Sequence, residues 1–186
     1  MEIGNPYEIH RTIMNAFPGD IQDDERVLFR IEGPSEEGIV ILVQSKYCPD
    51  WSAMKVGNDY LADWPSVKEF DPKFSSDHQY RFRLLANPTR KVLGKRLGEL
   101  GDENALDWLE RKANAGGFQI SEAQAIPKGF VRIKAKDRTM SLYSVLYDGT
   151  LNVIDPPKFT ATYEVGIGSG KGFGYGLLSL ARGRIE

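Results

Sequence analysis

The sequence has little of what a metal site or a disulfide needs: one cysteine, Cys48, and two histidines, His10 and His78, among 186 residues. A single cysteine excludes an internal disulfide and a cluster of thiolate ligands, and it is typical of a reducing compartment. With so few histidines beside it, a zinc site of the usual kind is not expected either. We therefore expect a cytoplasmic protein that needs no cofactor and no tightly bound metal.

Long apolar runs are also missing. No stretch approaches the roughly 20 residues that cross a bilayer, and the start MEIGNPYEIHRT has neither the basic nor the apolar region of a signal peptide. Hydrophobic residues make up 41% and charged residues 27% of the chain, which is ordinary for a globular protein. We therefore expect no membrane partner, and the length suits one large domain or two small ones.

The sequence has almost no net charge, −2 at pH 7, but its basic residues are unevenly distributed. Residues 79–96, QYRFRLLANPTRKVLGKR, carry six basic side chains and no acidic one. Residues 128–138, KGFVRIKAKDR, carry five basic side chains and one aspartate. Such separation lets a nearly neutral protein present a basic face to a polyanion, although runs of like charge also occur by chance on ordinary surfaces.

The first half of the chain predicts one helix followed by strands. Asn5 is a plausible N-cap, Pro6 suits the first helical position, and apolar residues recur at helical spacing before Pro18-Gly19 ends the pattern. Residues 26–33 and 38–45 are apolar and β-branched, as expected of strands. Residues 79–86 alternate, with apolar side chains on one face and arginines on the other. We place a domain boundary after residue 88, which gives domains 1–88 and 89–186.

The second half repeats this mixture of helix and strand. We expect a helix over 102–117, strands over 118–126 and 129–136, a hairpin that turns at Asp148-Gly149, a short helix from Pro156, and a closing strand over 176–183. Two mixed halves indicate an α+β protein of two units, each close to a β-α-β-β-α-β pattern. The first half opens on its helix, without the strand that this pattern places first.

A glycine-rich loop, GIGSGKGFGYG, lies near the end of the chain with six glycines between Gly166 and Gly176. It is not a P-loop, because Lys171 is followed by Gly172 in place of a hydroxyl residue, and the sequence that follows predicts a strand. It also lies too late in the chain for a dinucleotide fingerprint. A loop without side chains can approach phosphates closely. A simple tight turn would explain two or three of the glycines.

Four blocks of the sequence carry a family resemblance. They are NPYEIHRT, VILVQS, RFRLLANPTRKV and GIGSGKGFGYGLLSLA, and LYDGTLNVIDP also fits. With these blocks in order from Asn5 to Ala181, the chain resembles the CasE family, the CRISPR RNA-processing endoribonucleases of type I-E Cascade. The resemblance implies two tandem ferredoxin-like (RRM-like) domains, of which the first here lacks its leading strand. It also implies CRISPR repeat RNA and guide RNA as ligands and other Cascade subunits as partners.

The resemblance places a catalytic pair at Tyr7 and His10. Three residues apart on the predicted helix, the two side chains lie on nearly the same side, and an imidazole titrates near neutral pH. The implied reaction is metal-independent: the RNA 2′-hydroxyl attacks the adjacent phosphate and leaves a 2′,3′-cyclic phosphate and a 5′-hydroxyl. We expect His10 to act as general base or general acid, Tyr7 to orient the ribose or phosphate, and Arg11 to steady the developing charge.

The family cuts at the 3′ base of the repeat hairpin and stays bound to the product, so RNA-binding residues are also expected. A-form RNA is bound through its shape and its phosphates. The candidates are basic or loop residues: Arg81, Arg83, Arg90, Lys91, Arg132, Lys134, Lys136, Arg138, Gly166, Gly168, Gly170, Lys171, Gly172 and Gly174.

Two other functions stay open. The chain could be a non-catalytic subunit that binds the RNA hairpin on the same fold, because a fold does not guarantee activity. It could also be an enzyme that binds a small nucleotide at the glycine loop. That reading needs magnesium ligands and a hydroxyl after Lys171, and the sequence offers neither.

Overall fold

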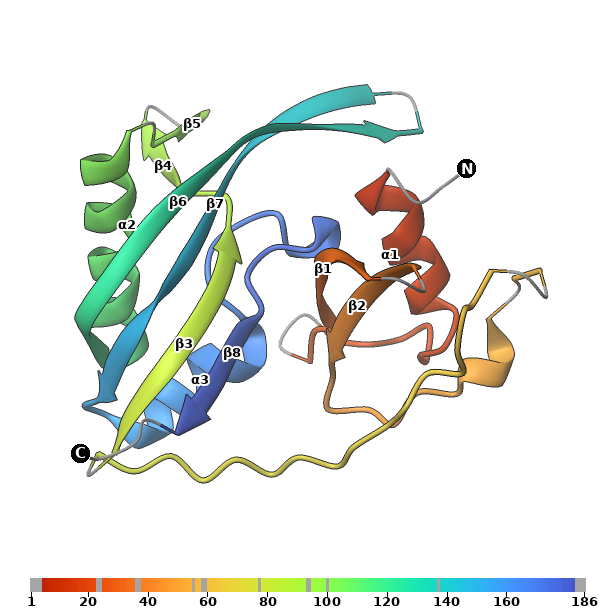
Figure 1. Cartoon of the computed structure of the whole chain (residues 1–186), viewed down its shortest axis with the longest axis horizontal. Coiled ribbons are helices and arrows are strands. Elements are labelled where there is room, and N and C mark those ends of the chain that lie inside the picture. The colour runs from red at the N-terminus through yellow and green to blue at the C-terminus, as the bar shows by residue number, and fades with distance from the viewer. Residues whose placement is uncertain are drawn as a thin grey trace.

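In the computed structural model, helices and antiparallel strands form two units that lie side by side (Figure 1). The structure describes residues 5–22, 25–35, 38–54, 56–57, 60–76, 78–92, 95–99, 101–136 and 138–182. The mixed α+β class that the sequence predicts is confirmed. None of the helices in the described part of the chain is long and apolar enough to span a membrane.

The first unit packs one helix, α1 (Pro6–Met14), on a two-stranded sheet of β1 (Leu28–Ser35) and β2 (Gly38–Gln44). The predicted start of α1 is confirmed, since the Asn5 side chain accepts a hydrogen bond of 3.3 Å from the Tyr7 N–H and Pro6 begins the helix. The core between helix and sheet consists of Ile9, Ile13, Ala16, Phe17, Val27 and Phe29. A short 3-10 turn, η2 (Trp51–Ala53), and an extended segment then lead to the second unit.

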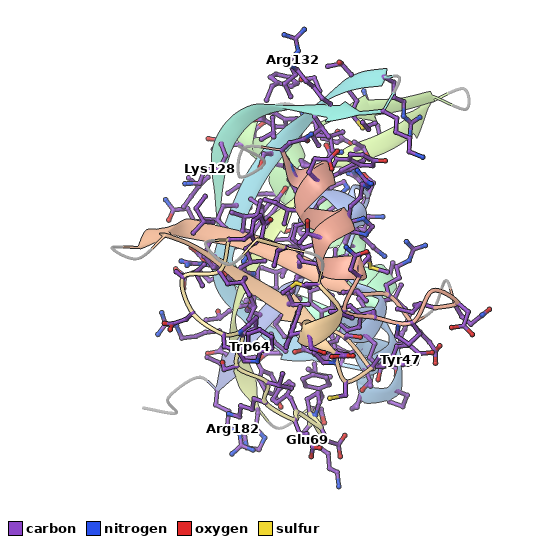
Figure 2. All side chains as sticks on the ribbon, turned by 90° about the vertical axis from the view of Figure 1, so that its right-hand side faces the viewer. Tyr47, Trp64, Glu69, Lys128, Arg132 and Arg182 are labelled. Carbon is purple, nitrogen blue, oxygen red and sulfur yellow. The ribbon has the colours of Figure 1, made fainter. Side chains whose placement is uncertain are left out.

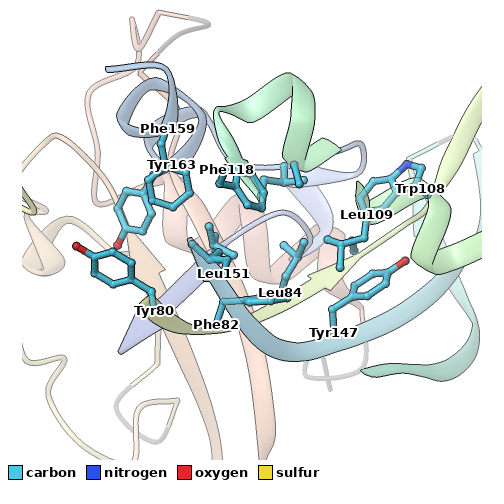
Figure 3. Close-up of a cluster of buried hydrophobic side chains, with 14 of the residues drawn as sticks. Tyr80, Phe82, Leu84, Trp108, Leu109, Phe118, Tyr147, Leu151, Phe159 and Tyr163 are labelled. Atoms are coloured by element: carbon cyan, nitrogen blue, oxygen red, sulfur yellow. The ribbon is translucent and has the colours of Figure 1, made fainter. Parts of the chain in front are cut away.

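The second unit contains β3 (Gln79–Ala86), α2 (Asp102–Gly116), β6 (Phe118–Ala135), β7 (Arg138–Val153), α3 (Pro156–Val165) and β8 (Leu178–Arg182). Its strands form one antiparallel sheet in the order β6-β7-β3-β8. Both helices cover the same face of this sheet (Figure 1). The core lies between these helices and the sheet, where Trp108, Leu109, Tyr147, Leu151 and Phe159 are almost completely buried (Figure 3).

The partners of β3 correct the sequence prediction. Residues 79–86 were expected in the first domain, but β3 pairs with β7 over its whole length and with β8 on its other side. Its alternation is as predicted: Tyr80, Phe82 and Leu84 enter the core, whereas Arg81 and Arg83 are exposed on the opposite face. Alternation shows which face of a strand is buried but not which strands it joins. β3 therefore belongs to the four-stranded sheet of the second unit.

The expected hairpin turn at Asp148-Gly149 is also wrong, because β7 runs straight through both residues. Gly149 pairs with Ala123 beside a bulge in β6, where the register shifts between Ile120 and Glu122. A Cβ atom on Gly149 would lie 2.1 Å from the Glu122 carbonyl oxygen. The glycine is therefore needed for the close approach of two strands at a bulge, which is a known use of glycine within a sheet.

The strands β6 and β7 form a long hairpin that reaches over α1 (Figure 1). The sequence predicted two separate strands here, whereas β6 is continuous through a second bulge between Pro127 and Gly129. Near the end of the hairpin, the Asn5 side chain donates a hydrogen bond of 2.8 Å to the Lys134 carbonyl. A small hairpin of β4 (Thr89–Val92) and β5 (Lys95–Gly98), which the sequence did not predict, precedes α2.

Arg30 of β1 joins the two units. Its guanidinium pairs with Glu32 at 2.6 Å and donates to the carbonyls of Arg83 at 3.2 Å and Leu177 at 3.3 Å. It also donates to the Ser179 hydroxyl at 2.8 Å. Only 4% of this arginine is exposed. Because a buried guanidinium needs its donors satisfied, these bonds fix β1 against β3 and the start of β8.

Candidate functional site

His10 lies where α1 meets the glycine loop. Helical spacing directs Ile9 and Ile13 into the first core and leaves His10 at the edge of that buried stripe. Its ring lies 6.1 Å from the Phe29 ring, measured between centroids. Its Nε2 atom faces Gly172, since a Cβ atom on Gly172 would lie 3.6 Å from it. Gly172 belongs to a 3-10 turn, η3 (Lys171–Phe173), which Figure 1 shows beside α1.

The environment of His10 favours an uncharged ring. Burial lowers the pKa of the imidazole below its ordinary value of 6.5, because a charged ring loses hydration there. The ring is therefore largely neutral at pH 7 and can accept a proton. The unfolded chain binds this proton at a higher pH, so folding stability falls as the pH drops below 6.5 toward the folded pKa.

Tyr7 and Arg11 lie beside His10 on the same helix, as the sequence predicts. The Arg11 guanidinium carbon lies 6.0 Å from the centroid of the Tyr7 ring. Its Nη1 atom is 2.8 Å from a Glu8 carboxylate oxygen, and 61% of the arginine side chain is exposed. The guanidinium is thus accessible to an anion from solution, although it is paired with Glu8.

The glycine loop is built by its backbone. Gly166, Gly168, Gly170, Gly174 and Gly176 have φ angles of +80° to +90°, which side chains rarely adopt. This corrects the expectation that a turn explains only two or three of the glycines. Gly172 is the exception, because its φ is not left-handed. The loop leads into β8 and not into a helix, which agrees with the exclusion of a P-loop.

The same glycines let the loop pack tightly between the two cores. Added Cβ atoms would lie 2.8 Å from Leu28 at Gly166, 2.8 Å from Trp108 at Gly168 and 3.2 Å from Phe29 at Gly174. Leu28 and Phe29 belong to β1, whereas Trp108 belongs to α2. The loop is therefore wedged between the units, and this holds η3 against α1 at His10.

Lys171 is half-buried in this loop, and burial lowers the pKa of its amine to about 8. The positive charges of Arg26 and Lys112 contribute the smaller part of this lowering. The sequence prediction included Lys171 but missed Arg26 and Lys112, because they lie on segments far from the loop in sequence. Spacing along the chain gives no signal for such a cluster.

The predicted basic residues of the long hairpin, Arg132, Lys134, Lys136 and Arg138, all have exposed side chains. Ile133 and Ala135 are buried, so alternation along β6 directs Arg132 and Lys134 outward, while Lys136 lies in the turn and Arg138 begins β7. Figure 2 shows Arg132 at one end of the molecule, above α1. Through the bond from Asn5, these cations are connected to the start of the helix that carries His10.

The other predicted basic residues are dispersed. Arg81 and Arg83 lie on the face of the sheet opposite α2 and α3, and Arg83 makes two bonds, of 2.7 and 2.9 Å, to the Asp148 carboxylate. That pairing leaves Arg83 less suited to a phosphate. Arg90 is exposed on β4, and the side chain of Lys91 lies outside the described part of the chain. Within the described ranges, no three His, Cys, Asp or Glu residues form a possible metal ligand set.

The chain is similar to known CRISPR-associated proteins over almost its whole length. The family described as "CRISPR associated protein" matches residues 1–182. CRISPR-associated endoribonuclease Cse3 of Thermus thermophilus is 35% identical, and the match covers 97% of this chain and 92% of the relative. CRISPR system Cascade subunit CasE of Escherichia coli is 25% identical over 94% of this chain and 91% of the relative. The structure of Thermus thermophilus Cse3 bound to an RNA representing a pre-cleavage complex has a TM-score of 0.86 at 35% identity, covering 97% of this chain and 90% of that one.

Proposed function

Since the chain belongs to the CRISPR associated protein family, and its resemblance to CasE is confirmed, we propose that it is an endoribonuclease that processes precursor CRISPR RNA. In this proposal it cuts at the 3′ base of the repeat hairpin, keeps the mature guide RNA and joins other Cascade subunits in the cytoplasm. The observation that carries the proposal is the neutral His10 imidazole, with Nε2 facing the bare backbone of Gly172. Gly172 itself presents no side chain to a phosphodiester that approaches this nitrogen.

The proposed reaction uses the substrate's own nucleophile and needs no metal. Nε2 of His10 takes the proton of the 2′-hydroxyl, and the 2′ oxygen forms a bond to the adjacent phosphorus. The bond from phosphorus to the 5′ oxygen breaks, and that oxygen leaves with a proton from water or an acid. The products are a 2′,3′-cyclic phosphate and a 5′-hydroxyl. The pKa of His10 favours the role of general base, because the neutral ring predominates at pH 7.

Two neighbours of His10 have further roles in this proposal: one stabilises the charge that develops on the phosphate, and the other orients the substrate. Negative charge grows on the phosphoryl oxygens in the transition state, and a nearby cation lowers its energy. Arg11, exposed on the next turn from Tyr7, supplies this cation. Tyr7 orients the ribose or the phosphate from the same side of the helix. The bare backbone at Gly172 lets the phosphate come close to both the helix and the loop.

The long β6–β7 hairpin is the proposed surface for the RNA stem. Its four exposed cations lie around the end of the hairpin that reaches over the start of α1: Arg132 and Lys134 on β6, Lys136 in the turn, and Arg138 at the start of β7. Stem recognition in A-form RNA depends on shape and phosphate contacts, which suits a row of cations on a rigid hairpin. The bond between Asn5 and Lys134 then sets the position of a bound stem relative to His10.

The proposal also covers the fold of each domain. Apart from the inserted β4–β5 hairpin, residues 79–182 have the succession β-α-β-β-α-β, with the first strand of the set in the sheet interior, and this supports a ferredoxin-like second domain. We place the domain boundary between Met54 and Gln79. In the first domain, α1, β1 and β2 match the helix and the next two strands of a ferredoxin-like unit.

A second candidate is a subunit that binds the hairpin without cutting it. It is favoured by the small sheet beneath α1, which has two strands in the described part of the chain. The two functions are separated by incubating the purified chain with the repeat hairpin in EDTA. One cut at the 3′ base supports the enzyme, whereas tight binding without a cut identifies the binding subunit.

We expect Gly172→Ala to slow cleavage by roughly tenfold or more, which corresponds to about 1.4 kcal/mol in the barrier. The new methyl group would stand 3.6 Å from His10 Nε2, in the space assigned to the phosphate. Folding should be nearly unaffected, because the φ of Gly172 is not left-handed and the contact distance is ordinary. Single-turnover cleavage and thermal unfolding check both parts. A control is Gly19→Ala, where an added Cβ meets nothing within 4 Å. A Gly172→Ala protein that is folded and cuts at the wild-type rate would contradict the placement of the phosphate.

A further inference from the structure

A pocket of about 280 Å³ lies beside η3, the turn whose Gly172 faces His10. Gly170 and Phe173 of the glycine loop form one side of this pocket. Its other walls come from β4, from the end of β5 and from the β6–β7 hairpin. Because Phe173 directly follows Gly172 in the chain, the pocket lies next to the site assigned to the reaction.

Much of the pocket wall is aromatic and apolar. Phe130 of β6 is 64% exposed, and its ring lies 5.3 Å from the Tyr143 ring of β7, measured between centroids. Phe173 supplies a third ring, and Leu142 and Met140 of β7 supply aliphatic surface. Among the described residues that line the pocket, none carries a charge. The exposed rings suit a flat, uncharged group that can stack on them.

A polar wall faces the same space. The Thr89 hydroxyl lies 3.2 Å from the Ser169 hydroxyl, which also donates a bond of 3.4 Å to the Asn87 carbonyl. The Asn87 side-chain amide donates a bond of 3.5 Å back to the Ser169 hydroxyl. These bonds are long, and a hydroxyl can both donate and accept. The wall can therefore exchange them for shorter bonds to a ligand edge that carries donors and acceptors.

A nucleobase combines these two requirements, since it has a flat face for stacking and a polar edge for hydrogen bonds. A phosphate does not fit, because the pocket wall supplies no cation. Exposed cations lie instead next to the lining residues in sequence: Arg132 is two residues beyond Phe130, and Arg90 follows Thr89. This arrangement suits an RNA strand whose base enters the pocket while its phosphates stay outside.

We propose that this pocket, the base pocket, binds the nucleobase of the RNA nucleotide directly after the cut. The proposal rests on the proposed function. With a cut at the 3′ base of the hairpin, the nucleotide before the cut is paired in the stem, whereas the next nucleotide is unpaired. Its base is therefore free to turn away from the stack. This nucleotide also carries the 5′ oxygen that leaves, so the base pocket holds the leaving side of the substrate while the phosphate lies at His10.

The test measures the binding of two RNAs, neither of which can be cut. The first is the repeat hairpin with a 2′-deoxy nucleotide before the cut and one nucleotide after it. The second ends at the cut with a 3′-phosphate. Phe130→Ala should weaken binding of the first RNA about tenfold, a usual loss when a base no longer stacks on an aromatic ring. Binding of the second RNA should not change, because it has no base for the pocket.

Two further variants control for a general effect of losing a ring. Phe130→Trp keeps an aromatic ring and should bind the first RNA as the wild type does. Phe70→Ala removes another exposed phenylalanine, 62% exposed, from the extended segment before β3, and should not affect either RNA. Thermal unfolding shows that each variant is folded. Equal losses on both RNAs in Phe130→Ala would overturn the proposal, because the ring would then act through the stem. Wild-type binding of the first RNA by folded Phe130→Ala would overturn it as well.

A second measurement needs no variant. Removing only the base of the last nucleotide, as an abasic site, should weaken wild-type binding about tenfold. The abasic RNA should also bind equally well to the wild type and to Phe130→Ala, because the two changes remove the same contact. If the wild type binds neither hairpin, this inference and the proposed function both fail. If it binds both hairpins tightly and the abasic site has no effect, the inference alone fails.

Discussion

Replacing His10 with alanine is expected to slow cleavage of the repeat hairpin by about 10²- to 10⁴-fold, the usual contribution of a general base or acid. The side chain faces the loop backbone at Gly172 and carries the only imidazole on α1. Binding should change little, because the cations assigned to the RNA stem lie on the β6–β7 hairpin. Single-turnover cleavage, with protein in excess over RNA, isolates the chemical step from product release.

The matched control for this substitution is His78→Ala, which removes the other histidine of the chain. His78 lies next to Tyr80 at the start of β3, in the second unit. Thermal unfolding of both variants shows whether either has lost its fold, since the His10 ring also contacts Phe29. A folded His10→Ala protein that cuts as fast as the wild type would contradict the assigned role. Equal losses in both variants would point to a general effect of losing an imidazole.

Replacing Arg30 with alanine is expected to lower the free energy of unfolding by about 3–5 kcal/mol, the usual cost of breaking a buried ion pair. The substitution removes bonds to Glu32, to the Arg83 and Leu177 carbonyls and to Ser179. A buried carbonyl group that loses its hydrogen-bond donor lowers the stability of the folded state. Since these bonds hold β1 against the second sheet, cleavage should fall more than hairpin binding does. Urea unfolding measures the first effect.

The control for Arg30 is an exposed arginine with a similar partner. Arg83→Ala breaks an ion pair with Asp148 in which 49% of the arginine side chain is exposed, and should cost at most about 1 kcal/mol. Arg30→Lys keeps the charge but not the forked set of donors, so its stability should lie between those of wild type and Arg30→Ala. If Arg30→Ala unfolds at the same urea concentration as Arg83→Ala, the buried guanidinium does not join the units.

Local signals in the sequence predicted the helices well. Asn5 and Pro6 set the start of α1, and Pro156 opens α3 with Asp155 as its cap. Such signals succeed because a cap bonds to backbone groups within its own turn. The closing strand was also predicted, since its apolar run follows the glycine loop directly.

Long-range pairing was not accessible in this way. Asp148-Gly149 has the composition of a hairpin turn, yet in the structure the glycine admits the Glu122 carbonyl from a neighbouring strand. The partners of β3 lie about 65 and 100 residues further along the chain, at Arg83 opposite Asp148 and Ser179. The role of Arg30 could not be predicted for the same reason. Its partners come from β3 and β8, and nothing in RVLFRIEG marks it as buried.

In the candidate site, too, local features could be predicted from the sequence and long-range contacts could not. The residues of α1 and the glycine loop were identifiable from the sequence, because each lies in one short block that resembles a family. Their placement against each other, with His10 Nε2 toward Gly172, required the structure. The effect of the Arg26 and Lys112 charges on Lys171 had no signal in the sequence, because these residues lie far from the loop along the chain.

The most direct test of the central claim compares two substrates with the wild-type chain in EDTA. One is the all-ribose repeat hairpin from the same genome, and the other carries a single 2′-deoxy nucleotide immediately before the cut. We predict one cut in the first, with 2′,3′-cyclic phosphate and 5′-hydroxyl ends, and none in the second, which should still bind. Cutting of the deoxy hairpin, or products with 3′-hydroxyl and 5′-phosphate ends, would contradict attack by the RNA's own hydroxyl.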